Sequence, residues 1–257
     1  MSNKPNKLKT WREGTRIGIF DNGDNPKNKV REISTSWGYA TVDGRLGQRH
    51  QEVLDALIAC AVLSKPLDED NPKTCDYRLF IDSVGLRSML GWDMTRYELI
   101  VNCIKDLMKS IVTVEPKNSR IVSMSGIIKS AKSTGKVRAK QNGSYNQAPS
   151  AEPTGKLIGG QLWAIDISIE WLTLIEDQPS YYPLAVLRLK HGESKKLAKF
   201  IHSHVSPQYF LSKALREWMQ IDRRHRPRAK NKMLREADDL EKVGVVIDHE
   251  TLKITKK

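Results

Sequence analysis

The chain has 257 residues with a formal net charge of +13, and 39% of them are hydrophobic. This length predicts one large domain or two small ones, and the basic balance indicates a polyanionic partner, most often nucleic acid. Three cysteines without a CxxC spacing argue against a disulfide framework and a structural zinc site, so we expect neither metal nor cofactor. No apolar run reaches the roughly 18 residues of a membrane span, and no signal-peptide core is present, which predicts a cytoplasmic protein without membrane contacts.

Short elements are expected at the start of the chain. Residues 1–8 are polar and predict a loose tail, and Thr15–Phe20 predicts a strand. Val30–Trp37 and Tyr39–Val42 then predict a hairpin, because both are rich in residues that favour strands and glycine separates them.

Helical periodicity begins at Gln48. Apolar residues recur there at spacings of three and four, which predicts a helix that ends at Lys65-Pro66. Ser83 is a suitable N-cap for a short helix over Val84–Leu90. Thr95 and Glu98 form a capping box in front of the most strongly amphipathic helix of this half.

A hairpin and a polar segment follow that helix. Ile111–Val114 and Arg120–Ser123 predict the hairpin, so residues 83–128 have the order short helix, longer helix, hairpin. Residues 130–156 contain few large apolar side chains and have a net charge of +4. Such a segment cannot bury enough surface to become ordered by itself, which predicts a mobile loop or linker.

The second half opens with shorter elements. Gly160–Ile167 predicts a strand and Ile169–Ile175 a helix, while Tyr181–Leu189 fits either a strand or the start of a helix. Glu193–His204 predicts a helix with one apolar face.

The last fifty residues give the clearest functional signal. Tyr209–Met219 predicts a short amphipathic helix, and a basic run follows it. Residues 223–235 contain seven arginines or lysines and no acidic residue. The run leads into a second helix that Gly244 is suited to end, with its apolar residues three and four positions apart: Met233, Ala237, Leu240 and Val243.

Two strands complete this region. Val245–Ile247 and Leu252–Ile254 flank a turn at residues 248–251. Helix, turn, helix and hairpin is the order of a winged helix, whose second helix enters the DNA major groove. Because the N-terminal residues of such a helix face the bases, the basic run predicts a DNA-reading element.

Together these elements resemble the winged-helix replication initiators of broad-host-range plasmids, the TrfA and RepC type. The resemblance rests on Leu86–Gly91 with the helix and hairpin after it, on Gly160–Ile165 with Ser194–His202, and on Arg226–Gly244 with Leu252–Lys256. It implies an α+β fold with two winged-helix domains in tandem. The expected divisions are an N-terminal tail and strand (1–34), a first winged-helix domain (35–130), a flexible basic linker or loop (131–156) and a second winged-helix domain (157–257).

The resemblance also implies a function. Such a protein binds direct repeats in double-stranded DNA at a plasmid origin and leads the host replication initiator and helicase machinery to it. The first domain would carry the contacts of a possible homodimer. A winged-helix transcriptional regulator is the alternative, because DNA-binding residues alone do not separate the two functions.

The candidate DNA contacts lie in both units. In the second unit they are the basic residues of the run and the wing: Arg223, Arg224, Arg226, Arg228, Lys230, Lys232, Arg235, Lys253 and Lys256. Two or three of Arg228, Lys232 and Arg235 are expected to read guanine edges, and the others to neutralise phosphates. In the first unit the candidates are Arg96, Tyr97, Lys105, Lys117 and Arg120, where a packing or dimerisation role is equally expected.

An enzymatic reading is less favoured. His202 and His204 with Tyr209 resemble the metal-binding pair and nucleophile of rolling-circle nickases. The pair ends a helical pattern, however, where residues two apart point about 200° away from each other. The chain also lacks a Gly-x-x-x-x-Gly-Lys-Ser/Thr phosphate loop, so we expect no ATPase activity and no catalytic residues.

Overall fold

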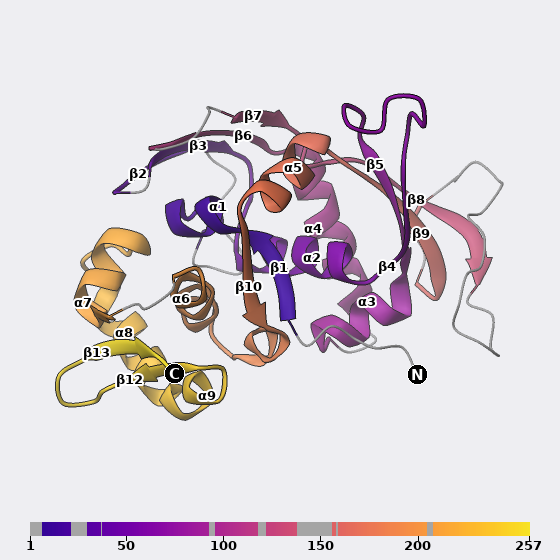
Figure 1. Cartoon of the computed structure of the whole chain (residues 1–257). Helices are drawn as coiled ribbons and strands as arrows, with labels where there is room; N and C mark the ends of the chain where they lie inside the picture. Colours follow the sequence, from indigo (N-terminus) through magenta and orange to yellow (C-terminus); the bar gives the residue numbers. More distant parts are fainter. Residues whose placement is uncertain are drawn as a thin grey trace.

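The computed structural model describes residues 7–21, 30–36, 38–92, 96–117, 122–137, 156–157, 159–204 and 208–257 (Figure 1). Helices and antiparallel sheets are both prominent in these ranges, which confirms the α+β class. Within the same ranges, no helix combines the length and the apolar character needed to cross a lipid bilayer.

Both hairpins expected in the first half are present, and they join into one sheet. In spatial order the sheet consists of β2 (Val30–Thr35), β3 (Gly38–Asp43), β6 (Ile111–Pro116) and β7 (Val122–Ser125). Alternate side chains of the two central strands are buried in the core, as the two-residue period of a strand requires: Ala40, Val42, Val112 and Val114. The pairing of β3 with β6 joins segments far apart in the chain, which periodicity alone does not predict.

A second antiparallel sheet joins strands from both halves of the chain. In spatial order it consists of β4 (Ala61–Pro66), β5 (Tyr77–Asp82), β9 (Gln161–Ile167) and β8 (Ile128–Val137). The strand β8 covers the start of the predicted linker, so that part of the prediction is wrong, and residues 138–155 lie outside the described residues. Ser130 and Thr134 donate hydrogen bonds to the Asp166 carboxylate and the Leu162 carbonyl of β9, so a strand of polar composition is held there. The predicted boundary at residue 157 separates β9 from both of its partner strands.

The N-terminal segment is part of the fold. Lys7–Trp11 forms β1, which pairs with β10 (Pro179–Pro183), and Arg12–Ile17 forms helix α1. The predicted tail is therefore wrong at Lys7 and Leu8, and its other residues lie outside the described ranges. The predicted strand at 15–20 is wrong, because α1 extends to Ile17 and no strand follows it there. Trp11 is only 1% exposed and meets Trp171 of α5 (Ile169–Asp177) edge-on at 5.7 Å between ring centroids. This tertiary contact overrides the weak local preferences of the segment.

Three further helices form as expected, with different ends. They are α2 (Gln48–Ala59), α3 (Ser83–Leu90) and α4 (Tyr97–Lys109). The helix predicted to reach residue 65 ends at Ala59, because the next residues pair with β5 as β4. Asp82, and not Ser83, caps α3 by accepting a hydrogen bond of 3.1 Å from the Val84 amide. Thr95, the predicted cap of α4, lies outside the described residues.

Helix α2 meets α6 (Gly192–His202) through buried charged groups. Lys195 donates a hydrogen bond of 3.0 Å to the Glu52 carboxylate, and the Tyr182 hydroxyl donates one of 2.7 Å to Asp55. Burial raises the pKa of Asp55 to about 6. The Lys199 ammonium lies 5.2 Å from the centre of the Tyr182 ring. Ion pairs and hydrogen bonds therefore link the two halves at this contact.

The last helices and strands form the C-terminal unit, residues 192–257, at the lower left of Figure 1. After α6 it contains β11 (Gln208–Phe210), α7 (Leu211–Lys213), a π-helical turn η3 (Ala214–Trp218), α8 (Arg226–Arg235), α9 (Ala237–Lys242), β12 (Val245–Ile247) and β13 (Lys253–Lys256). The strand β13 lies between β11 and β12, so the hairpin pairs with the strand that directly precedes α7.

Two predictions for this unit need correction, and one is confirmed. The helix expected over 209–219 begins at Leu211, because Tyr209 and Phe210 pair with β13. The second helix is divided at Glu236, whose buried carboxylate accepts hydrogen bonds from the amides of Lys190 and His191. These residues follow the 3-10 helix η2 (Leu184–Arg188) and precede α6. The hairpin of Val245–Ile247 with the strand after Leu252 is confirmed.

Candidate nucleic-acid interface

Asp222 organises the turn that presents the basic run. Its backbone carbonyl accepts a hydrogen bond of 2.8 Å from the His225 amide, and its side chain accepts one of 2.9 Å from the Arg224 amide. The hydrogen bonds that the Asp222 carboxylate accepts from the Arg224 amide and guanidinium keep its pKa below the usual value. The Arg224 side chain is 84% exposed, so the turn carries a cation into solvent in front of α8.

Helix α8 contains most of the basic run. Pro227 lies in its first turn, where the missing amide hydrogen of proline has no helical partner to lose. Ala229 and Met233 are buried, and these two residues fix which side of the helix faces the core. Arg228, Asn231 and Arg235 are exposed on the opposite side, and we call these three residues the outer face of α8.

Lys232 does not belong to the outer face. Its ammonium lies 2.7 Å from the Glu193 carboxylate of α6, and the two side chains are 29% and 19% exposed. Arg226 is also engaged, because its Nε donates a hydrogen bond of 2.8 Å to the Ile221 carbonyl. From the sequence, Lys232 is predicted to contact bases together with Arg228 and Arg235, whereas in the structure it pairs with Glu193 of α6.

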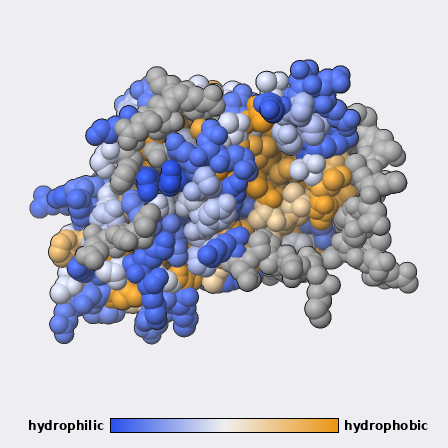
Figure 2. Space-filling model, in the orientation of Figure 1, coloured by the Kyte–Doolittle hydropathy of each residue, from blue (hydrophilic) through white to orange (hydrophobic). Residues whose placement is uncertain are grey.

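A groove of about 540 Å³ runs beside α8 on the side of η3. Leu215, Pro227 and Leu252 supply apolar lining. Four cations also line it, of which Arg216 is absent from the sequence-based candidates: Arg216, Arg223, Arg226 and Lys230. In Figure 2 the surface at the lower left is largely hydrophilic, with small hydrophobic areas among the hydrophilic side chains. The groove therefore combines apolar side chains with four cations in its lining.

The hairpin has a compact turn. The Asp248 side chain accepts hydrogen bonds from the amides of Glu250 and Thr251, at 2.9 and 2.8 Å. Lys253 is half-buried at the start of β13. Lys256 donates a hydrogen bond of 3.1 Å to the His204 carbonyl, so its ammonium is partly occupied by the protein itself.

The candidates of the first unit lie in different settings. The Tyr97 ring packs 6.2 Å from the Trp163 ring, and the Arg87 guanidinium lies 5.2 Å from its centre. This packing explains why Tyr97 is half-buried. Arg96, Lys105 and Lys117 are exposed, and Arg120 lies outside the described residues.

The two histidines and the tyrosine of the nickase reading are held by different groups. A ring nitrogen of His202 lies 2.7 Å from the Val243 carbonyl, and one of His204 lies 2.9 Å from the Phe200 carbonyl. Burial lowers the pKa of His204 to about 4. The Tyr209 ring packs against Trp218 with ring centroids 4.1 Å apart. Across the described residues, no group of three or more His, Cys, Asp or Glu side chains is arranged to hold a metal ion. That the chain is not a nickase stays a prediction.

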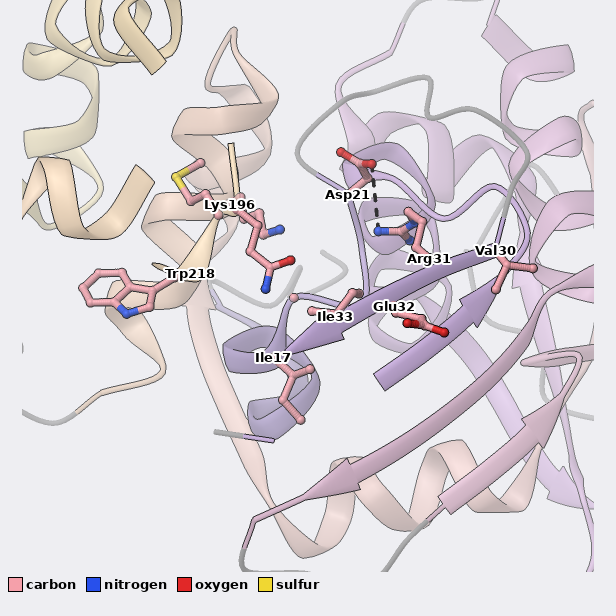
Figure 3. A pocket seen from close by; sticks show the side chains of 11 residues that line it. Ile17, Asp21, Val30, Arg31, Glu32, Ile33, Lys196 and Trp218 are labelled. Atoms are coloured by element: carbon pink, nitrogen blue, oxygen red, sulfur yellow. Dashed lines mark ion pairs between the residues drawn. The ribbon is translucent and has the colours of Figure 1, made fainter. Parts of the chain in front are cut away.

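A polar cavity of about 340 Å³ separates α1 and β2 from α6 and η3 (Figure 3). Two cations that line it donate to backbone carbonyls: the buried Lys196 to that of Phe20 at 3.0 Å, and the partly buried Arg31 to that of Ile19 at 2.8 Å. Arg31 also lies 3.9 Å from the Asp21 carboxylate. The Lys196 contact joins α6 to the segment after α1, whereas the contacts of Arg31 stay within the N-terminal part of the chain. Both cations are thus engaged by the protein itself. The cavity is therefore a weaker candidate for a binding site than the surface of α8.

Comparison with known proteins identifies the fold. A selenomethionine crystal structure of domains 2 and 3 of RctB aligns with 96% of this chain and 97% of that chain, at a TM-score of 0.59 and 12% identity. A second crystal structure of RctB domains 2-3 aligns with 92% of each chain, at a TM-score of 0.53 and 12% identity. No protein-family model matches the sequence, and no curated protein matches it. The chain therefore has the fold of these two RctB domains.

Proposed function

We propose that this protein is a replication initiator that binds double-stranded DNA sequence-specifically through a winged helix formed by residues 192–257. The observation that carries the proposal is the outer face of α8, which presents Arg228 and Arg235 on the second helix of a helix-turn-helix followed by a hairpin. The strand order β11-β13-β12 and the element order of the unit both support a winged helix.

A second winged helix, at residues 35–130, completes the proposal of two such domains in tandem. The order α3, α4, β6 and β7 supports it, since a short helix, a longer helix and a hairpin follow one another. Arg96, Lys105 and Lys117 would contact the DNA backbone from this unit, as would Arg120. Tyr97 would position α4 through its packing on Trp163.

The role in replication is supported by the fold. RctB is a replication initiator, and this chain aligns with two of its domains over nearly the whole length of both chains. By this proposal the protein acts in the cytoplasm as a plasmid initiator that binds direct repeats at an origin. Its further partners would be the host replication initiator and helicase machinery and a second copy of the chain. It would act by binding and not as an enzyme.

The basic residues divide into two roles. Arg228 and Arg235 would reach base edges, since guanine offers two acceptors to an arginine in the major groove. Cations beside the helix and on the wing would neutralise phosphates: Arg216, Arg223, Arg224, Arg226, Lys230, Lys253 and Lys256. If about six phosphates are neutralised, the logarithm of the binding constant should fall with a slope of about −5 against the logarithm of the salt concentration.

Footprinting of the purified protein on DNA that flanks its own gene, across a salt series, tests this function. Phased repeats protected about one or two helical turns apart, with a salt slope near the expected value, would support the initiator. A single protected palindrome over the promoter would favour the transcriptional regulator. Smeared and salt-labile binding without a protected site would refute sequence-specific recognition. For variants that remove one cation from the basic run, Lys73→Ala is the matched charge control, because Lys73 is exposed in the loop between β4 and β5.

A further inference from the structure

Asn231 is the uncharged polar residue of the outer face, between Arg228 and Arg235. We propose that Asn231 reads an adenine base in the major groove and determines specificity at that position. The inference rests on the proposed DNA-binding function and adds to it a residue and a base.

Geometry places Asn231 at the outermost position of α8. The buried residues Ala229 and Met233 lie two positions before it and two positions after it. Each is about 200° away around the helix axis, so Asn231 points almost directly away from the side that packs on the protein. A helix that lies in a groove presents this line of side chains to the base edges.

The fold itself has no use for the Asn231 side chain. Within the described part of the chain, no hydrogen bond or ion pair engages the side chains of Asn231, Arg228 or Arg235. Asparagine is a poorer helix former than lysine, arginine or alanine, because its amide competes for backbone groups. An asparagine in the exposed middle of a ten-residue helix therefore lowers helix stability, and no hydrogen bond or ion pair of its side chain with the described residues offsets that loss.

The chemistry of the side chain points to adenine. The asparagine amide offers one donor group and one acceptor on a short arm, and adenine presents a matching acceptor at N7 and donor at N6. Arg228 and Arg235 lie about 4.5 and 6 Å from Asn231 along the axis, at about 1.5 Å per residue. The three side chains thus span about 10 Å, the length of about three base pairs.

The other sides of α8 are less suited to reading bases. Lys232 is paired with Glu193 on one side, and Arg226 is bonded to the Ile221 carbonyl on the other. Lys230 lines the groove beside η3, where a long cation can reach a phosphate. The outer face is the side of the helix on which a short polar side chain, Asn231, lies between two long ones, Arg228 and Arg235.

The test is selection of bound sequences from a randomised duplex pool by the full chain and by Asn231→Ala. Alanine is the better helix former, so the variant is expected to fold. We expect the wild-type consensus to contain an adenine that the variant no longer selects, and the affinity for the consensus duplex to fall about 5- to 150-fold. Binding to a scrambled duplex should not change.

Replacement of that adenine by 7-deazaadenine removes the N7 acceptor and gives a second readout. It should weaken binding of the wild-type protein and leave binding of Asn231→Ala unchanged. A wild-type protein that selects no consensus would refute the proposed function itself. A clear consensus that Asn231→Ala selects unchanged would overturn only the assignment of Asn231.

Discussion

Lys232→Ala is expected to lower the stability of the fold more than the affinity for DNA. Arg228→Ala is expected to lower the affinity for DNA more than the stability. The Lys232 ammonium lies 2.7 Å from the Glu193 carboxylate, with both side chains mostly buried. An exposed ion pair contributes about 0.2–1 kcal/mol, and breaking a fully buried one costs about 3–5 kcal/mol. The partial burial of this pair places the loss on Lys232→Ala at about 1–2 kcal/mol in the free energy of unfolding.

Arg228 has a different environment. It is exposed on the outer face, and within the described residues no hydrogen bond or ion pair holds its side chain. Its replacement should change the free energy of unfolding by less than about 0.5 kcal/mol. If the side chain reads a base, specific binding should weaken by about 1–3 kcal/mol and the preference at one position should relax.

Two assays on the same preparations separate these effects. Urea unfolding followed by tryptophan fluorescence gives the stability of each variant, and fluorescence anisotropy with a footprinted duplex gives its affinity. A double-mutant cycle of Lys232→Ala with Glu193→Ala isolates the pair, since alanine at Glu193 should make the second replacement nearly neutral. The assignment of the two sides of α8 is wrong if Lys232→Ala leaves stability unchanged and relaxes the same base preference as Arg228→Ala.

Two further predictions concern the scaffold. Gly126 has a φ of 69°, and an added Cβ would lie 2.8 Å from the Met108 carbonyl oxygen; Gly160 has a φ of 81° and nothing within 4 Å. Gly160→Ala should therefore lower the free energy of unfolding by about 1–2 kcal/mol, the cost of a left-handed backbone, and Gly126→Ala should lower it clearly more. Equal losses in urea unfolding would contradict the close approach to the Met108 carbonyl. Burial lowers the pKa of Lys196 to about 8 from 10.5. Because the unfolded chain binds more protons between these values, stability should rise by about 2 kcal/mol from about pH 7.5 to about pH 9.5. Lys196→Met should lack that rise, and an equal rise in both proteins would exclude Lys196 as its source.

Local patterns predicted the elements whose neighbours in the chain are also their neighbours in space. Both hairpins and the helices α3, α4 and α6 follow from periodicity and turn residues within about fifteen residues of each other. The basic run was equally visible, because charge needs no fold to be counted. Its arrangement was not: the sequence grouped Lys232 with Arg228, and the carboxylate that separates them comes from Glu193, on a different helix.

Elements that depend on distant partners were missed. The polar strand β8 exists because β9 offers it a ladder of backbone groups, and β1 exists because β10 does. The lysines of α6 look like a solvated face, yet Lys195 and Lys199 are buried against the acidic and amide groups of α2. In each case the deciding partner lies more than about twenty residues away. Single-sequence patterns carry no information about it.

The pairing of β1 with β10 has a consequence for the order of folding during synthesis. Lys7 pairs with Pro183 and Trp11 with Pro179, so about 170 residues separate the two strands in the chain. At about 5–20 residues per second, β10 leaves the ribosome about 10–30 s after β1. During this interval Leu8 and Trp11, which are buried in the folded protein, lack the strand beside which they become buried. The strand β1 therefore stays unpaired with β10 during this interval, and its apolar side chains are exposed to other contacts until β10 has been made.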